Sequence, residues 1–248
     1  MITAHLKHIN ATESRLNSFI ELLASQAKSS AMRADEALND GSVLGPLHGI
    51  PVGLKDLYDV EGVRTTVGSK ILRNSLSQRD SSVTERLKAA GAIILGKLQM
   101  HEFALGATSL NPHDGPARNP WDTDRMTGGS SGGSASSVSS GQCMAAMGSD
   151  TGGSIRIPSS LCGIVGLKPT FGRVSRRGVY PLAHSLDTVG PMTRTVEDAA
   201  IILNVIAGYD PQDSSSSNRN VEDYTKSLNE GVKGIRIGIP REYFFDML

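Results

Sequence analysis

The sequence predicts an α/β fold in which a mixed β-sheet core is covered by α-helices. Helical and strand-like hydrophobic patterns alternate along the chain, which is typical of a sheet with helical cover. The 248 residues include 27 glycines, above the usual share of about 7%. Aromatic residues make up only 4% of the chain. Together these observations favour a tightly turned core that is built from aliphatic side chains.

Residues 12–38 carry an amphipathic helical pattern. Its apolar positions are Leu16, Phe19, Ile20, Leu23 and Ala27. This spacing predicts one helix, which Gly41 and the Gly45-Pro46 pair end. Before it, His5 and His8 lie in a terminal segment that we expect to be frayed.

Three further elements follow in the next part of the chain. Alternating apolar residues from Ile50 to Leu54 predict a buried strand that leads directly into Lys55. Residues 83–90 predict a helix that Gly91 ends, and residues 92–95 predict a short buried strand.

Four further elements are predicted in the second half of the chain. Residues 144–147 predict another strand, and residues 195–207 predict a helix with Gly208 as its stop. Residues 209–220, with four consecutive serines, predict an exposed loop. The alternating isoleucines of residues 235–239 predict a strand just before Pro240.

Two glycine–serine segments are the most informative feature of the sequence. They read GGSSGGS over 128–134 and GSDTGGSIR over 148–156, and each places a serine, Ser130 or Ser154, directly after a Gly-Gly pair. Glycine has no Cβ, so backbone N–H groups there can approach a ligand closely. A serine hydroxyl beside such donors has the parts of a nucleophile with an oxyanion hole.

Composition alone would also suit a flexible linker in the first segment. Its flanks argue against a linker, because Asn119-Pro120-Trp121 precedes it and the predicted strand at 144–147 follows it. Residues 134–140 predict a serine-rich helix whose N-terminus points back at the glycines. Such a terminus stabilises a developing anion, and small side chains permit close packing under a sheet.

Lys55 is the candidate base for these serines. A serine hydroxyl is a poor nucleophile unless a neighbouring group removes its proton, and a lysine can do so only when it is neutral. Burial at the end of an apolar strand lowers a lysine pKa, because burial disfavours the charged form. The alternative is a surface lysine that pairs with Asp56 or Asp59.

These segments, together with CGIVGLKPT over 162–170, resemble the amidase signature family of serine hydrolases. The resemblance extends from about Leu16 to the last residues. It implies the amidase signature fold and a Ser–cis-Ser–Lys triad made of Ser154, Ser130 and Lys55. In this scheme Lys55 takes a proton from Ser130, which takes one from Ser154, and Ser154 attacks an amide carbonyl.

The resemblance also implies supporting roles. The oxyanion would be bound by backbone N–H groups of Thr151, Gly152, Gly153 and Ser154. The peptide bond between Gly129 and Ser130 is expected to be cis. Ser131 is expected to form hydrogen bonds within the site, and Asp150 and Arg156 are expected to hold the nucleophile turn in shape.

Family members usually carry one domain of nearly twice this length. The resemblance therefore implies that residues 1–248 are the N-terminal part of a single, C-terminally truncated amidase signature domain. Within it we expect a helical lead-in over 1–40, a catalytic core over 45–208, and a loop with the start of the missing half over 209–248.

The leading functional prediction is an amide hydrolase that cleaves a small carboxamide to a carboxylate and ammonia or an amine. One alternative is the glutaminase (A) subunit of a tRNA-dependent amidotransferase, which would need partner subunits and tRNA. Another is a non-catalytic fragment or one half of a split enzyme, which would bind a C-terminal half or a homodimer partner. Retention of all three triad residues argues against long-standing loss of catalysis.

Composition excludes several other classes. The formal net charge is zero, so nothing indicates a nucleic-acid or anionic-membrane surface, and the arginines at 173, 176 and 177 are expected to lie in a solvated loop. Cys143 and Cys162 are expected to be reduced core residues of a cytoplasmic protein. We expect no metal and no cofactor, because no HExxH, CxxC, GxGxxG or Walker A motif is present.

Overall fold

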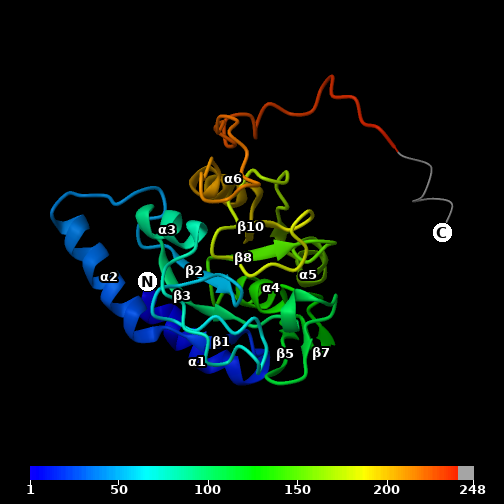
Figure 1. The fold of residues 1–248 in the computed structure, drawn as a ribbon. Coiled ribbons are helices and arrows are strands. Elements are labelled where there is room, and N and C mark those ends of the chain that lie inside the picture. The colour runs from blue at the N-terminus through cyan, green and yellow to red at the C-terminus, as the bar shows by residue number, and fades with distance from the viewer. Residues whose placement is uncertain (240–248) are drawn as a thin grey trace.

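The computed structural model describes residues 1–239 of the chain. Seventeen helical and strand elements are formed along it (Figure 1). In chain order they are α1 (Ile2–Leu16), β1 (Phe19–Leu22), α2 (Ala24–Asn39), β2 (Pro51–Lys55), α3 (Ser82–Ala89), β3 (Ile93–Leu98), the 3₁₀ turn η1 (Glu102–Ala104), β4 (Leu110–Asn111), β5 (Gly115–Pro116), β6 (Arg118–Asn119), β7 (Asp122–Met126), α4 (Gly132–Ser139), β8 (Ala145–Asp150), α5 (Arg156–Cys162), β9 (Val165–Gly166), β10 (Thr188–Thr193) and α6 (Val196–Ile206).

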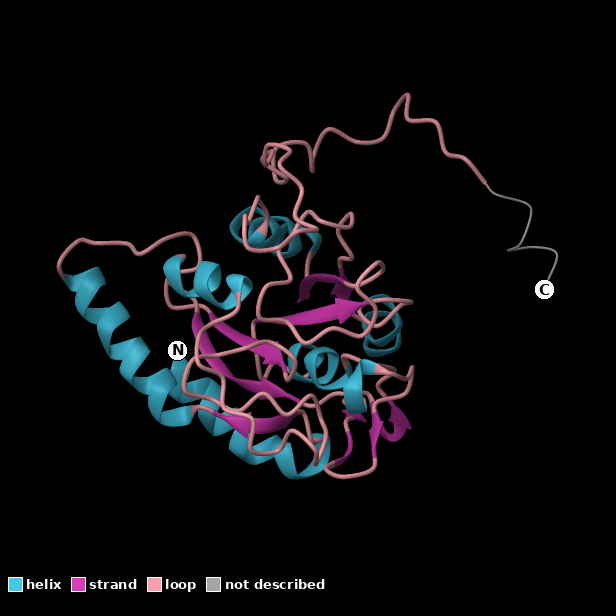
Figure 2. Cartoon of the chain, viewed as in Figure 1, coloured by secondary structure: helices cyan, strands magenta, loops and turns pink. Residues whose placement is uncertain are grey.

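A six-stranded sheet in the order β1-β3-β2-β8-β10-β9 forms the centre of the molecule. The central strand β2 pairs parallel with both β3 and β8, whereas β10 pairs antiparallel with β8 and β9, and β1 pairs antiparallel with β3. The predicted mixed sheet is therefore confirmed. Buried residues along the whole of β2, β3, β8 and β10 fit a sheet whose two faces are both covered (Figure 2).

Helices cover the sheet on both sides. On one side α3 and α6 pack through Val83, Leu87, Ile202 and Ile206 against Leu54 and its neighbours in the larger core cluster. On the other side α1 and α4 pack against β3 in a second cluster, with α2 alongside α1 (Figure 1). Because successive side chains of a strand point to opposite faces of the sheet, Leu54 of β2 points toward α3 and α6, whereas Lys55 points toward the side of α4.

The prediction of one helix over residues 12–38 is wrong. Asn17 ends α1 in the left-handed conformation, with φ at 51° and its N–H donating to the Glu13 carbonyl. The following residues, from Phe19, form β1 and pair with the outer edge of β3. Pairing with this sheet edge satisfies backbone groups that a helix would otherwise have used, so tertiary structure overrides the helical spacing.

The expected fraying of the N-terminal segment is also contradicted. The segment forms most of α1, and Ile2 and Ile9 are buried against the sheet. His5 Nδ1 lies 3.1 Å from the Gln142 carbonyl oxygen, and His8 Nε2 lies 2.8 Å from that of Ser140. These contacts join α1 to the chain that links α4 to β8.

The other predicted elements of the core are present. The strands at 51–55, 93–98 and 145–150 and the helices at 82–89 and 196–206 match the expected positions within a few residues. Thr195 caps α6, since its hydroxyl accepts a hydrogen bond from the N–H of Asp198 at 3.1 Å. Within the described residues, no helix is long and apolar enough to cross a bilayer.

The strand predicted over residues 235–239 is not formed. Ile235, Ile237 and Ile239 are 64–84% exposed, and the chain there extends away from the body of the molecule (Figure 1). Within residues 1–239, no strand pairs with this segment, so its backbone groups do not form the hydrogen bonds of a sheet. Pro240, which the same prediction included, lies outside the described residues.

Helix α4 lies deep in the molecule because its residues are small. Every residue from Gly132 to Val138 is buried. A Cβ on Gly133 would lie 2.5 Å from the carbonyl oxygens of both Gln99 and Ser18. The helix can approach the end of β3 this closely only because glycine occupies that position.

We expect Gly133→Ala to lower the free energy of unfolding by about 1–3 kcal/mol, because backbone atoms cannot move aside for the added methyl group. Urea denaturation would measure the change. Gly152→Ala is the matched control, since no atom lies within 4 Å of the place that its Cβ would take, and its stability should stay close to that of the parent. Equal stability of both variants would contradict the close packing of α4.

Candidate functional site

Lys55 ends β2 inside the protein. Its side chain is fully buried, and Nζ donates to Ser130 Oγ at 2.6 Å and to Ser149 Oγ at 2.9 Å. Burial lowers the pKa of the amine to about 7, although the negative charges of Asp150 and Asp187 act in the opposite direction. A substantial fraction of the amine is therefore neutral near pH 7.

The alternative partners of Lys55, Asp56 and Asp59, are used elsewhere. The carboxylate of Asp56 forms a fully buried ion pair with Lys97 at 2.8 Å, and Asp59 accepts from the Ser77 hydroxyl at 2.8 Å. Among residues 1–239, no carboxylate lies within salt-bridge distance of Lys55. The lysine therefore contacts two hydroxyls instead of a counter-ion.

Ser130 is held by the loop that follows β3. The Gly129–Ser130 peptide bond is cis. The Ser130 carbonyl oxygen accepts from the N–H of His101 at 3.1 Å and from the hydroxyl of Ser109 at 3.2 Å. A Cβ on Gly129 would lie 2.7 Å from the N of Ser109, so the two loops approach more closely than a larger residue would allow.

Ser131 connects the Ser130 loop to the second glycine–serine segment. Its N–H donates to the Ser154 carbonyl at 3.3 Å. Its hydroxyl lies 3.3 Å from both the carbonyl oxygen and the N–H of Ser149. The two segments, far apart in sequence, are thus fastened to one another beside Lys55.

Asp150 organises the turn between β8 and α5. Its buried carboxylate accepts from the N–H groups of Ile155 and Arg156 at 3.1 and 3.3 Å, and from Arg156 Nε and Nη2 at 3.0 Å each. Burial acts to raise the pKa of Asp150, but the Arg156 and Ile155 hydrogen bonds outweigh it and lower that pKa. The structure therefore places both residues around the turn that contains Ser154.

The turn itself presents unused donors. In the described part of the chain, the backbone N–H groups of residues 151–154 donate no hydrogen bond, and neither does the Ser154 hydroxyl. Gly152 is exposed, with open space where a Cβ would stand. Such a row of free N–H groups can receive a negatively charged oxygen.

The N-terminus of α4 does not play the anion-binding part expected of it. The helix begins at Gly132, and the N–H of Gly132 donates to the Ser109 hydroxyl at 3.0 Å. The N–H of Gly133 donates to the Gln99 carbonyl at 2.9 Å. These donors are already occupied, because the helix is packed tightly under the sheet.

The start of β10 secures the same turn from the opposite side. The hydroxyl of Thr151 donates to Asp187 at 2.5 Å, and the hydroxyl of Thr188 donates to the Asp150 carbonyl at 2.9 Å. Residues 150 and 151, where the segment that leads to Ser154 begins, are therefore held by β10 and by the residue before it.

A cavity of about 200 Å³ opens beside the turn. Its lining includes Ser149, Thr151 and Asp187, which we call the inner side, and Arg176, Arg177 and Asp213, which we call the outer side, together with apolar residues such as Leu57 and Val189. The cavity is adjacent to the partners of Lys55, so a small molecule held there would lie next to the site.

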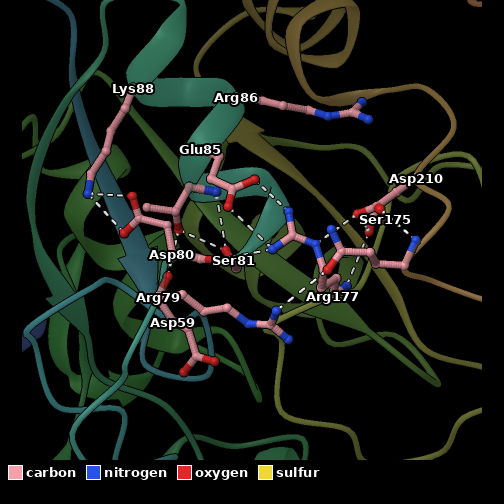
Figure 3. Close-up of polar contacts among 12 residues, drawn as sticks. Asp59, Arg79, Asp80, Ser81, Glu85, Arg86, Lys88, Ser175, Arg177 and Asp210 are labelled. Carbon is pink, nitrogen blue, oxygen red and sulfur yellow. Dashed lines mark hydrogen bonds and ion pairs between the residues drawn. The ribbon is translucent and has the colours of Figure 1, made fainter.

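The prediction of a solvated loop is wrong for the two arginines of the outer side, Arg176 and Arg177. The Arg177 side chain is only 9% exposed and pairs with Glu85 at 2.5 Å and Asp210 at 3.1 Å (Figure 3). Asp210 also accepts from the Ser175 hydroxyl at 2.7 Å. These contacts tie residues 209–217 and the loop before β10 to the start of α3.

Arg176 adds a second connection across the outer side of the cavity. Its backbone N–H donates to Asp213 at 2.7 Å, and its guanidinium donates to the His184 carbonyl and the Ser215 hydroxyl, each at 2.7 Å. Residues 209–220 do form a loop, but several of its polar side chains are fixed to the body of the protein.

Cys143 and Cys162 are free and buried, as expected of core residues. Burial raises the pKa of each thiol to about 12. Neither thiol therefore forms a thiolate near neutral pH. Within residues 1–239, no group of three or more His, Cys, Asp or Glu side chains could hold a metal ion.

Sequence reasoning missed three residues that the structure brings to the site. Ser149 lies inside the second glycine–serine segment, but the pattern gave no indication that it accepts from Lys55. Asp187 and Lys97 had no local signal beyond their position at a strand end or within a strand. Their partners, Thr151 and Asp56, lie 36 and 41 residues away in the sequence.

Comparison with known proteins gives a consistent match. A family model described as Amidase matches residues 1–248. The A subunit of the glutamyl-tRNA(Gln) amidotransferase from Trichlorobacter lovleyi is 53% identical over 98% of this chain. Two solved structures also match. One is described as a vestigial protein complex that reveals the evolutionary origins of an s-triazine catabolic enzyme, with TM-score 0.93 and 45% identity over 95% of this chain. The other is the peptide amidase of Stenotrophomonas maltophilia, with TM-score 0.86 and 40% identity over 90%.

The chain spans about half the length of the proteins it matches. The aligned region is 50% of the Trichlorobacter lovleyi protein, 52% of the matched chain of the vestigial complex and 48% of the peptide amidase. In each case the similarity covers nearly all of this chain, so the fold described here is shared with these proteins.

The depressed pKa of Lys55 makes a prediction about stability. The unfolded chain keeps the ordinary lysine pKa of 10.5, so between about pH 7 and 10.5 it binds more protons than the folded chain. Stability relative to Lys55→Met should therefore rise across this window, by about 2–3 kcal/mol from pH 7 to pH 9. Urea denaturation of both proteins at several pH values would measure the difference, and a constant difference would contradict neutral burial of Lys55.

We expect Arg177→Met to lower the free energy of unfolding by about 2–4 kcal/mol, because it leaves the buried Asp210 carboxylate without its cation. Thermal or urea denaturation would measure the loss. Arg125→Met is the control, since Arg125 is 79% exposed and its pairing with Asp122 should be worth less than about 1 kcal/mol. A loss no larger than that of the control would show that Arg177 does not secure the outer side of the cavity.

Proposed function

The chain belongs to the amidase family, and from that premise we propose that it carries the reaction centre of an amide hydrolase with Ser154 as nucleophile. The observation that carries the proposal is the contact of 2.6 Å between the buried amine of Lys55 and the hydroxyl of Ser130. A lysine without a carboxylate partner, and with a pKa lowered to about 7, can accept a proton at neutral pH.

In the proposed reaction Ser154 Oγ forms a bond to the amide carbonyl carbon. Its proton passes to Ser130 Oγ, whose own proton passes to Lys55 Nζ. The carbon–nitrogen bond then breaks, and the departing amine takes a proton from Ser130, which Lys55 restores. Water next attacks the acyl ester on Ser154, and its proton passes through Ser130 to Lys55. The proton returns by the same path to the Ser154 oxygen as the carboxylic acid is released.

The free N–H groups of Thr151, Gly152, Gly153 and Ser154 are proposed to bind the oxyanion of each tetrahedral intermediate. Each donor of this kind is typically worth about 3–4 kcal/mol of barrier. Asp150, Arg156, Ser131 and Gly129 are proposed to maintain the geometry. The Ser154 hydroxyl donates no hydrogen bond within residues 1–239, and catalytic hydrogen bonds often tighten only when substrate is bound.

A second candidate is the glutaminase subunit of a tRNA-dependent amidotransferase. It is favoured by the 53% identity, over 98% of the chain, to the A subunit of a glutamyl-tRNA(Gln) amidotransferase. The same reaction centre would then release ammonia from glutamine, and partner subunits and tRNA would be required. Glutamine hydrolysis that increases when such subunits are added, with no hydrolysis of simple amides, would favour this candidate.

The remaining sequence of the relatives bears on both candidates. Because the chain matches about half of each relative, we propose that the complete reaction requires further surfaces, supplied by a C-terminal half or by a second copy of the chain. The substrate in either case is a small amide. A chain that folds but shows no chemistry at Ser154 would support the fragment alternative.

We expect a fluorophosphonate to label the Ser154 peptide stoichiometrically, because an activated serine beside free N–H donors mimics the first half of the reaction. Intact mass and peptide mapping would measure the label. Ser154→Ala should abolish labelling, and Lys55→Met should slow it by at least about 100-fold. The labelling rate should rise with pH around a midpoint near 7, since only neutral Lys55 accepts the proton.

Ser160→Ala is the matched control for this experiment. Ser160 is an exposed serine on α5, only six residues beyond Ser154, and its replacement should leave labelling unchanged. Label that persists in Ser154→Ala would refute the assignment of Ser154 as nucleophile, whereas absence of label in a folded parent chain would support the fragment alternative.

A further inference from the structure

Asp187 holds the turn before Ser154 from the cavity side. Its carboxylate accepts from the Thr151 hydroxyl at 2.5 Å, from the N–H of Leu182 at 2.8 Å, and from the N–H of Ala183 at 2.9 and 3.0 Å. The residue is only 8% exposed. All of its hydrogen-bond donors are neutral, so they orient the carboxylate without cancelling its charge.

The other buried carboxylates of this region each have a cation. Asp56 pairs with Lys97, Asp150 with Arg156, and Asp210 with Arg177. Across residues 1–239, no Lys, Arg or His nitrogen lies within 4 Å of Asp187. A buried carboxylate without a cation is uncommon, because burial of an unpaired charge is costly.

The amine of Lys55 is connected to the same cavity through Ser149. Ser149 lines the same cavity as Asp187 and accepts directly from Lys55 Nζ at 2.9 Å. Thr151, the hydrogen-bond partner of Asp187, lies two residues further along. Asp187 therefore contacts the turn that leads to Ser154 and lines the same cavity as one hydroxyl partner of the lysine.

We propose that Asp187 is a positioning residue with two effects: it fixes Thr151 and thereby the row of free N–H groups, and its unpaired carboxylate acts as the counter-charge of Lys55. The proposal rests on the proposed function of Lys55 as the base. In this proposal the residue just before β10 helps to set the pH at which Lys55 becomes neutral.

The charges around Lys55 agree with this assignment. Burial lowers the pKa of Lys55, and the charges of Asp150 and Asp187 counteract part of that effect. The charged or titratable groups that face the lysine, element by element, are Asp56 after β2 with its partner Lys97, His101 after β3, Asp150 at the end of β8 with its partner Arg156, and Asp187 before β10. Of the carboxylates in this set, Asp187 has no salt-bridge partner within residues 1–239.

Asp187→Asn separates the charge from the hydrogen bonds. The asparagine oxygen can still accept from Leu182 and Ala183, and its amide can donate to Thr151, because a hydroxyl also accepts. Removal of the negative charge disfavours the ammonium form of Lys55, so the Lys55 pKa should fall further. Thr151→Val does the reverse, since it removes the connection and keeps the charge.

The test is an NMR titration of the chain labelled with ¹³Cε-lysine, with the Lys55 signal identified by its loss in Lys55→Met. We expect the midpoint of Asp187→Asn to lie about half a pH unit or more below that of the parent, and that of Thr151→Val to stay in place. At pH 6 this corresponds to about a threefold larger neutral fraction of Lys55 in Asp187→Asn. Asp187→Ser is the second charge-removing variant and carries the same expectation if the asparagine variant does not fold.

Labelling by the fluorophosphonate separates the two levels of the proposal. The acid limb of the labelling rate should move down in pH in Asp187→Asn, whereas Thr151→Val should label more slowly with the limb unmoved. A Lys55 midpoint in the charge-removing variants equal to that of the parent would overturn the counter-charge. A parent that is never labelled, but whose Lys55 midpoint still shifts in Asp187→Asn, would favour the fragment alternative over the proposed hydrolase and leave the electrostatic inference supported.

Discussion

The burial of one amine organises this structure. Lys55 ends a central parallel strand with its amine removed from water, and its hydrogen-bond partners within residues 1–239 are the hydroxyls of Ser130 and Ser149. This arrangement disfavours the ammonium form, and it requires that the loops supplying those hydroxyls stay in place. The cis peptide at Ser130, the small residues of α4 and the close approach of the loop after β3 all place groups around this amine.

Carboxylates shape the surroundings of the amine without pairing with it. Asp56 lies next to Lys55 in sequence but is taken up by Lys97, and Asp150 is engaged by Arg156 and by backbone N–H groups. Each of these pairings also fixes a segment of chain, namely the loop after β2 and the turn before α5. Buried charges in this region thus mainly position segments of backbone. Within residues 1–239, Lys55 has no direct counter-ion.

The outer side of the cavity depends on a separate polar network. Arg177 joins the start of α3 to the loop before β10 and to residues 209–217, through Glu85 and Asp210 (Figure 3). Near it, the Arg86 guanidinium donates to carbonyls at the end of α6, including that of Ile206 at 2.9 Å, and so completes that helix terminus. The cavity therefore lies between a rigid inner turn on the sheet and an outer side built from loops that ion pairs hold together.

By itself the sequence determined the mixed sheet, most core elements and the three segments that meet at Lys55, because hydrophobic periodicity and Gly-Gly-Ser motifs are local signals. It could not show that residues 19–22 leave the predicted helix, since a sheet edge supplied by β3 decides that. Nor could it find Ser149, Asp187 or Lys97 as partners, or show that Arg177 is buried in ion pairs and that Arg176 is hydrogen-bonded to neighbouring loops. Those outcomes depend on contacts between residues far apart in the chain, and only packing in three dimensions sets the burial that gives each charge its partner.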